Sequence, residues 1–366
     1  MNESVKFPFY LRAAIFITGI YFFVTILIAG QSIIVPVVYA ALFAILLNPV
    51  ISLLTRMGLN RVMAILITLI IAIALIVILF IFLSSQATRF SSSLPLLIDK
   101  FYKLLDQTVN NFSNRFNISV LSIKDRMAKT KGEVLNNLSY IISSTIYTMG
   151  NTLFVILIVP VYIFMISFYK PLLMDFVRKI TGEAHREKIN ELLTSTKSLI
   201  QSYLTGLIIE AAIVASMYST GLLIIGIQYA VLLGIIGALL NIIPYIGGGI
   251  AVVFYMIIAF VTKDSSSYVL WVAALFVFVH LIDNSYIIPK VVASKVKINA
   301  LVAITAVLIG GAIWGVPGMF LAIPLMGVIK LVFDRVELVK PWGFLLGDTM
   351  RPIINFKIKR RKNKNK

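Results

Sequence analysis

The sequence predicts an all-α, polytopic integral membrane protein with about six full spans and two opposed helical hairpins in an inverted repeat. Apolar residues make up 60% of the 366 residues and charged residues 13%, whereas soluble domains average about 45–50% and about 25%. The apolar residues fall in runs of roughly the 20 residues that cross a bilayer. Two of the later runs are interrupted by glycine and proline. These observations exclude a soluble globular enzyme and a disordered chain.

The first half of the chain contains four predicted spans. The first follows Lys6 and Arg12, the second ends at Asn48 and Pro49, and the third carries no charge. We expect the first two to form a hairpin that opens to the outside, because basic residues mark both of its ends as cytoplasmic. The four spans are expected at 13–30, 33–47, 62–83 and 150–169.

Two polar segments, 84–149 and 170–198, interrupt these spans, and both contain amphipathic helices. Their apolar residues recur at intervals of three and four, which places them on one helical face. We interpret each helix as lying on the bilayer or on a neighbouring helix, in preference to forming a subunit contact. The two faces consist of Leu94, Leu97, Ile98, Phe101, Leu104, Leu105 and Phe112, and of Ile189, Leu192, Leu193, Thr196, Leu199, Ile200 and Tyr203.

The distribution of basic residues predicts the orientation in the membrane. The formal net charge is +18, and residues 355–366 hold seven basic residues and no acidic one. Lysine and arginine concentrate on the cytoplasmic side of membrane proteins, and we prefer this explanation to nucleic-acid binding. The sequence therefore predicts a bacterial cytoplasmic (inner) membrane protein with both termini in the cytoplasm.

The C-terminal half contains two further predicted spans, 200–226 and 268–289, and each is followed by an apolar run that is broken by glycine and proline. Each broken run, 229–262 and 300–333, begins and ends on one side of the membrane, so each is expected to be a helical hairpin. The two hairpins have opposite orientations, which is a recurring plan of secondary transporters. At an offset of 73 residues, the sequence pairs Glu210 with Asp283, Gly237 with Gly310, and Pro244 with Pro317.

These elements divide the chain into five regions. They are scaffold spans (1–83), an extracytoplasmic helical insertion (84–149), a fourth span with a cytoplasmic amphipathic segment (150–198), a transport region with two broken-helix hairpins (199–334) and a basic cytoplasmic tail (335–366).

The interruptions in the two hairpins are the predicted substrate or ion path. Backbone amides within a bilayer must be satisfied by protein or water, and helix ends there can present amides or carbonyls to a ligand. The alternative is that they are ordinary tight turns between short helices. The predicted path residues are Asn241, Pro244, Tyr245, Gly247, Gly248, Asn284, Gly310, Gly311, Gly315, Pro317 and Gly318.

Glu210 and Asp283 are the carboxylates that lie well inside apolar spans. Such residues are costly in a membrane and usually mark a pathway or a proton relay, so both are predicted to couple transport to protons or cations. Alternatively, Glu210 pairs with a basic residue elsewhere, and Asp283 braces a helix near the interface. A structural hydrogen bond is the preferred role for His280.

The sequence gives no indication of a metal, a cofactor or an enzymatic reaction. It contains no cysteine, and its two histidines, His185 and His280, do not form an HExxH pattern. The phosphate-binding pattern GxxxxGK[ST] is also absent, so we do not expect this chain to be driven by ATP. We therefore expect no cofactor, no metal site and no enzyme.

Several motifs resemble those of the AI-2E (autoinducer-2 exporter) transporter family, which includes the PerM-like permeases. The motifs are Asn241-Ile-Ile-Pro244-Tyr245-Ile-Gly247, Asp283-Asn284 with Pro289-Lys290, Gly310-Gly311, Trp314-Gly315, Gly318, and Leu321-Ala322-Ile323-Pro324. One departure is Asn299-Ala300, where the family often has His-Pro. The resemblance implies an export permease for a furanone derivative used in quorum sensing, and a homo-oligomer, with a pentamer as the size considered. Some relatives resemble sodium- or lithium-proton antiporters.

The sequence therefore predicts a transporter that exports a small polar molecule, similar to autoinducer-2, by alternating access. Its expected partners are a small-molecule or ion substrate, the lipid bilayer and further copies of itself, with no nucleic acid. One alternative is a sodium- or lithium-proton antiporter on the same scaffold. Another is a membrane scaffold that transports nothing and recruits partners through residues 84–149.

Overall fold

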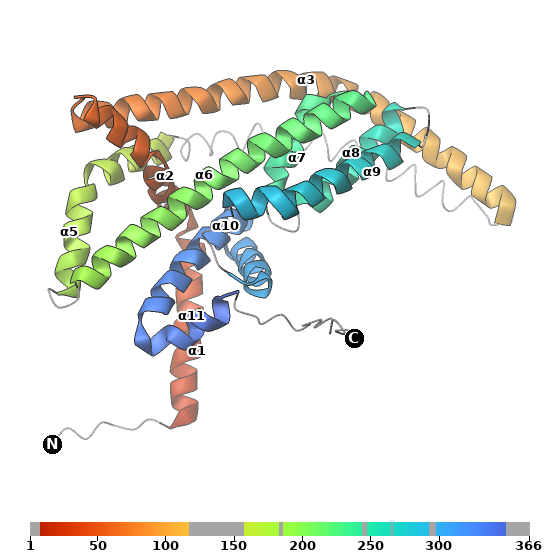
Figure 1. Ribbon diagram of the computed structural model, residues 1–366. Helices are drawn as coiled ribbons and strands as arrows, with labels where there is room; N and C mark the ends of the chain where they lie inside the picture. Colours follow the sequence, from red (N-terminus) through yellow and green to blue (C-terminus); the bar gives the residue numbers. More distant parts are fainter. Residues whose placement is uncertain are drawn as a thin grey trace, which may run out of the picture.

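The computed structural model describes residues 8–116, 157–182, 186–243, 247–263, 265, 267–292 and 298–348, which form an all-helical arrangement (Figure 1). Within these residues, the β-structure is limited to an isolated bridge between Ile298 and Gly347. In this described part, six helices are long and apolar enough to cross a membrane, and a bent pair of helices would make a seventh. The prediction of an all-α, polytopic membrane protein is confirmed.

The first two helices, α1 (Phe9–Ala29) and α2 (Gln31–Arg56), run end to end. Gly30 between them has nearly helical angles, φ −89° and ψ 7°. Its N–H bonds to the Ile26 carbonyl, and its carbonyl accepts from the Ile34 N–H, so helical bonding continues across it. Figure 1 shows α2 rising from the end of α1 without folding back along it. The predicted hairpin of the first two spans is therefore wrong.

Helix α3 (Arg61–Phe116) continues for 56 residues, through Pro95 and past the boundary predicted at 83/84. Its outer part packs on the hairpin that follows α6. Phe90 makes edge-to-face contacts with Tyr229 and Phe254, and Phe101 makes one with Phe260. Leu97 and Phe101 of the predicted apolar face thus pack against neighbouring helices. The rest of the predicted insertion, from 117 onwards, lies outside the described residues.

The fourth predicted span corresponds to the helix Leu157–Phe168, whose preceding residues, 150–156, lie outside the described part. A bend of 63° separates this helix from α5 (Lys170–Thr181). Ile163 packs with Ala40, Ala64 and Ile65, so the helix joins α2 and α3 in one apolar cluster.

The central element is α6 (Arg186–Ile225), a helix of 40 residues. It contains the second predicted amphipathic segment, and Leu199, Ile200 and Tyr203 of that face are buried against α2 and the last long helix. Beyond α6 the chain turns back as α7 (Ala230–Asn241) and returns as α8 (Gly247–Thr262). The predicted hairpin 229–262 is confirmed, and its tip, 244–246, lies outside the described residues.

The second half of the transport region begins with α9 (Ser267–Ile282), which continues as the π-helix η2 (Asp283–Val292). Helix α10 (Ala300–Arg335) then follows, with the short η3 (Glu337–Val339) and α11 (Lys340–Leu346) beyond it. At Gly315 the backbone leaves the helical conformation, with φ 64° and ψ −147°. A Cβ on Gly310 would lie 2.4 Å from the Gly318 carbonyl oxygen, so the two arms pack on each other. The predicted hairpin 300–333 is confirmed.

The two hairpins point in opposite directions along α6. Gly226, just beyond α6, lies next to Lys263 at the base of the α7–α8 hairpin. At the other end, Arg335 at the base of the α10 hairpin bonds to Glu191 and Ser195, near the start of α6. Figure 1 shows the teal hairpin along the C-terminal half of α6 and the blue hairpin toward its N-terminal half. The described end of the first hairpin, at Asn241, and the second tip, at Trp314, therefore both reach residues of α6, as predicted for opposed hairpins.

The turn at Gly315 yields a prediction about stability. Positive φ with ψ near −147° is a conformation that side chains rarely adopt, so Gly315→Ala should destabilise the protein by about 1–3 kcal/mol. The measurement is the apparent melting temperature of the purified protein in detergent. Gly19→Ala, at an exposed helical position with open space around it, is the matched control and should not lower it. Equal melting temperatures for Gly315→Ala and the unmodified protein would contradict the prediction.

Candidate functional site

The buried carboxylates of α6 and η2 meet at one amide side chain. Asn241 Nδ2 donates to Asp283 Oδ2 at 2.9 Å and, more weakly, to Glu210 Oε1 at 3.4 Å. The Asp283 residue is 2% exposed and Glu210 is 6% exposed. The three residues come from different elements, since Glu210 lies in mid-helix, Asn241 ends α7 and Asp283 begins η2. We call them the Glu210–Asn241–Asp283 site.

Local structure explains why these three residues meet. Helix α7 is apolar until Asn241, so its one polar residue lies at the tip of the hairpin, next to the middle of α6. On the other side, a Cβ on Gly206 would lie 2.5 Å from the Val291 carbonyl oxygen, so a larger residue there would separate α6 from η2. Asp283 is placed where the α-helix changes to a π-helix that contains Pro289. Such π segments are frequent at functional sites.

The two acids of the site have no ion-pair partner among the described residues. The ion pairs among the described residues join Asp175 to Arg178, Asp334 to Lys330 and Glu191 to Arg335, and none includes either buried carboxylate. In addition, Asp283 Oδ1 is buried and has no hydrogen-bond partner in the part of the chain that the structure describes. An ionised carboxylate is costly to bury unless it is paired. The site is therefore suited to a bound proton or a small cation, which carboxylate oxygens would coordinate.

The glycines of the predicted path differ in their surroundings. A Cβ on Gly247 would lie 1.6 Å from the Leu240 carbonyl oxygen, and one on Gly318 would lie 1.9 Å from the Gly310 carbonyl oxygen. The backbone that approaches these glycines belongs to the opposite arm of the same hairpin. Gly248 is different, because a Cβ there would lie 3.4 Å from Asn241 Oδ1. Of these four glycines, Gly248 is the one beside the polar site.

The tip of the second hairpin is held by polar contacts to the first helices. Trp314 Nε1 donates to the Leu27 carbonyl oxygen at 2.9 Å, and Tyr39 Oη donates to the Pro317 carbonyl oxygen at 3.2 Å. Gly311 lies against the side chain of Met319 in the opposite arm. The sequence reasoning did not identify Tyr39 or Leu27 as partners of this tip. The sequence did contain one signal for Tyr39, because a tyrosine hydroxyl within an apolar span needs a hydrogen-bond partner.

The two tips reach a common apolar cluster. Ile242 from the first tip and Trp314 from the second both pack against buried residues that include Tyr203, Leu204 and Leu207 of α6. The structure therefore brings together elements that are about 70 residues apart in sequence. This arrangement is the one that the inverted repeat predicts for a site near the middle of a bilayer.

Asn284, although adjacent to Asp283 and predicted in the path, does not join the Glu210–Asn241–Asp283 site. Asn284 is exposed, and its Nδ2 lies 2.8 Å from His280 Nε2 on the same helix. His280 also stacks on Phe276, in agreement with the structural role preferred for it. Pro244 and Tyr245 lie outside the described residues. Among the residues that the structure describes, there is no group of three or more His, Asp or Glu that could hold a metal ion.

Comparison with known proteins identifies the family. A sequence model for the AI-2E family transporter matches residues 11–337. The chain belongs to this family. One similar protein is YhhT of Escherichia coli (strain K12), which is provisionally named a transport protein. It is 27% identical over 335 residues, which is 87% of this chain and 89% of that protein. YueF of Bacillus subtilis (strain 168), also provisionally named a transport protein, is 24% identical over 315 residues, 83% and 85% of the two chains.

A third relative has a more specific name. The AI-2 transport protein TqsA of Escherichia coli (strain K12) is 25% identical over 330 residues, which is 87% of this chain and 90% of that protein. These matches cover most of both chains, so they extend over the scaffold helices as well as the hairpins. The chain is a membrane transporter of the AI-2E family.

The shared amide of this AI-2E family transporter yields a second prediction. Asn241→Leu removes the donor between two buried carboxylates, and an unsatisfied buried polar group costs about 1–3 kcal/mol. We expect a lower apparent melting temperature and a loss of transport in liposomes. Asn284→Leu is the matched control, because its amide is exposed and contacts His280. A variant at Asn241 as stable and active as the one at Asn284 would contradict the prediction.

Proposed function

We propose that the protein exports a small polar molecule similar to autoinducer-2 across the bacterial cytoplasmic membrane by alternating access. The observation that carries the proposal is the meeting of Asn241, at one hairpin tip, with Glu210 and Asp283 from two other helices. In secondary transporters, substrate and coupling ions bind near the middle of the bilayer, where broken helices of two repeats meet. The name of TqsA supports the substrate class, as does the family resemblance of the motifs.

Coupling of transport to an ion forms part of this proposal. A proton or cation on Asp283 or Glu210 would neutralise a buried charge, and its release would restore that charge. Because Asn241 contacts both acids, a change in the ionic state of either would act on the position of the first hairpin tip. The two hairpins would then move against the scaffold of α1, α2, α3 and the helix Leu157–Phe168.

A sodium- or lithium-proton antiporter on the same scaffold is the second candidate. It is favoured by the unpartnered Asp283 Oδ1 and by the absence of an ion pair to either acid among the described residues. In that case the ion that binds the carboxylates is itself the substrate. A scaffold without transport activity, which recruits partners through 84–149, is the outcome if neither substrate moves. We do not propose an enzymatic reaction.

The proposed setting includes the bilayer and further copies of the chain. Large apolar residues are exposed along α1 and along the first half of α3, for example Phe16, Phe22, Ile76 and Phe80. Contiguous exposed apolar surface of this kind is suited to lipid or to a partner helix. We propose a homo-oligomer in the inner membrane, with a pentamer as the size to test and with both termini in the cytoplasm.

Liposome flux tests the function and the coupling role together. Liposomes that contain the purified protein and are loaded with a furanone-type sugar derivative should release it faster than liposomes without protein. An imposed pH or sodium gradient should accelerate this release. Asp283→Asn keeps the shape and removes the charge, so it should abolish the dependence on the gradient while substrate still exchanges at equilibrium. Glu337→Gln, an exposed acid beyond α10, is the control and should behave as the unmodified protein.

Each outcome of the flux experiment assigns the function differently. Sodium-driven proton movement without furanone flux would favour the antiporter. Movement of neither substrate would favour the scaffold. Gradient-driven furanone flux that persists in Asp283→Asn would refute coupling by Asp283 and would leave Glu210 as the candidate.

Orientation is tested by cysteine labelling, since the chain contains no natural cysteine. A membrane-impermeant maleimide applied to intact cells should label Gln107→Cys in the outer part of α3. It should spare Glu337→Cys beyond α10 and Ser4→Cys near the N-terminus until the cells are permeabilised. Labelling of Glu337→Cys in intact cells would reverse the proposed orientation.

A further inference from the structure

A basic cavity lies away from the Glu210–Asn241–Asp283 site, among α2, α3, the helix Leu157–Phe168, α5 and α6. One part has a volume of about 490 Å³ and an adjoining part about 430 Å³. The two parts share Asn48, Ile51, Arg61, Lys170 and Met174. Sites that hold small molecules usually measure about 300–1,000 Å³, so either part could contain a ligand much larger than a single ion.

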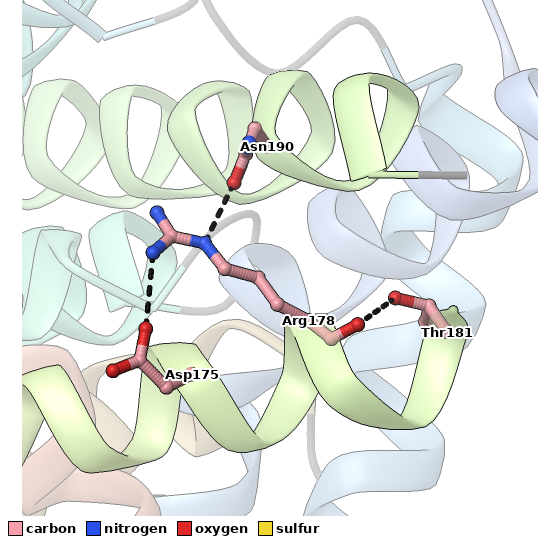
Figure 2. A network of polar contacts seen from close by, with 4 residues as sticks. All are labelled: Asp175, Arg178, Thr181 and Asn190. Atoms are coloured by element: carbon pink, nitrogen blue, oxygen red, sulfur yellow. Dashed lines mark hydrogen bonds and ion pairs between the residues drawn. The ribbon is translucent and has the colours of Figure 1, made fainter. Parts of the chain in front are cut away.

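The charge of the cavity wall is predominantly positive. Arg61, Lys170, Arg178 and Lys197 line it, and Asp175 is the acid among its lining residues. Arg178 Nη1 donates to Asp175 Oδ1 at 3.1 Å, and Arg178 Nε donates to Asn190 Oδ1 at 2.9 Å (Figure 2). Asp175 therefore already forms an ion pair with Arg178. The bond from Arg178 to Asn190 links α5 to the start of α6.

The other three cations have no acidic partner in the described part of the chain. None of Arg61, Lys170 and Lys197 belongs to an ion pair there. Moreover, Lys197 and Arg61 lie close enough to Lys170 for their charges to repel its ammonium group. Like charges held together are unfavourable, so an anion between them would relieve the repulsion.

The polar groups of the wall are mainly donors, and one of them lacks a partner. Arg61 Nη2 donates to the Ser167 carbonyl oxygen at 2.6 Å, and Lys170 Nζ donates to Asn48 Oδ1 at 2.7 Å. Each cation has further N–H groups, since a guanidinium carries five and an ammonium three. Ser167, which lines the second part of the cavity, is 7% exposed, and its hydroxyl is buried without a hydrogen-bond partner.

We propose that this cavity binds a phosphate group, as a monoester or diester, between Arg61, Lys170 and Lys197, with Ser167 donating to it. Arginine and lysine are both common phosphate ligands, and the guanidinium matches two phosphate oxygens at once. Basic pockets between membrane helices also bind the headgroups of anionic lipids. The phosphate can therefore belong to a lipid headgroup or to a soluble phosphate ester, which share the same recognition chemistry.

Binding there would act on the joint between scaffold and transport region. Arg61 begins α3, Lys170 begins α5 and Lys197 lies in the first half of α6, so one phosphate would hold three elements together. The Glu210–Asn241–Asp283 site contributes no residue to this cavity. The inference is thus independent of the transported substrate.

Thermal stability of the purified full-length protein in detergent tests the proposal. The soluble probe is glycerol 3-phosphate, compared with chloride at the same ionic strength. The lipid probe is phosphatidylglycerol in mixed micelles, compared with phosphatidylcholine. At least one probe should raise the apparent melting temperature, and native mass spectrometry should detect bound lipid if the headgroup is the source.

Two variants with the same change in net charge make the test specific. Lys170→Gln combined with Lys197→Gln removes two cations from the cavity and should raise the apparent Kd about tenfold or more, because charge-assisted hydrogen bonds to the phosphate are lost. Lys179→Gln combined with Lys188→Gln removes two exposed lysines outside the cavity lining and should leave the Kd unchanged.

The outcomes distinguish a soluble phosphate ester, a lipid headgroup and failure of the proposal. Stabilisation by glycerol 3-phosphate supports a soluble ester, and stabilisation by phosphatidylglycerol without glycerol 3-phosphate supports a headgroup. If the double variant of the cavity is too unstable to purify, Ser167→Ala, which keeps all three cations, should still weaken binding. No stabilisation by either probe, or equal Kd values in cavity and control variants, would overturn the proposal.

Discussion

The arrangement of the transport region depends on how two carboxylates are kept inside an apolar protein. Glu210 and Asp283 are both buried, and Asn241 donates to each of them. A single amide cannot neutralise two negative charges, so the site needs a proton or a cation when the acids lie this close to each other. The contact of Asn241 with both acids also fixes the place of the first hairpin, because the end of α7 must lie beside α6 and η2.

The hairpins depend on close contact between their own arms. Gly310 and Gly318 let two backbones of the second hairpin meet, and Gly247 lets α8 begin against the end of α7. Helices α7 and α8 have 12 and 16 residues, fewer than the roughly 20 that cross a bilayer, so the free backbone groups at their ends must be satisfied by protein or water. Trp314 and Tyr39 contribute to this at the second tip by joining it to the first two helices.

A second concentration of charge lies in the basic cavity among α2, α3, α5 and α6. Four cations and one acid line the basic cavity. The Glu210–Asn241–Asp283 site instead contains two acids, and neither forms an ion pair with another described residue. The two places thus favour ligands of opposite charge. Helix α6 passes both, since Lys197 lines the cavity and Glu210 belongs to the site. A ligand at one place therefore contacts the helix that forms the other.

The sequence by itself determined the elements that follow from one-dimensional patterns. Long apolar runs gave the helices, since backbone groups in a bilayer must bond within their own segment. Glycine and proline within the runs gave both hairpins, and Glu210 and Asp283 were identifiable because charge inside an apolar run is rare. The predicted hairpin of spans 13–30 and 33–47 failed because helical bonding continues across Gly30, so Gly30, Gln31 and Ser32 do not form a turn.

Tertiary structure alone decided which side chains meet. Asn241 was one of several predicted path residues, and only the packing of α7 on α6 shows that it bonds both acids. Asn284, adjacent to Asp283, faces His280 instead, because neighbouring residues on a helix point in different directions. The basic cavity was not predicted, since Arg61, Lys170 and Lys197 are far apart in sequence and each by itself is typical of a cytoplasmic loop. Long-range contacts of this kind depend on how the helices pack, which no local pattern encodes.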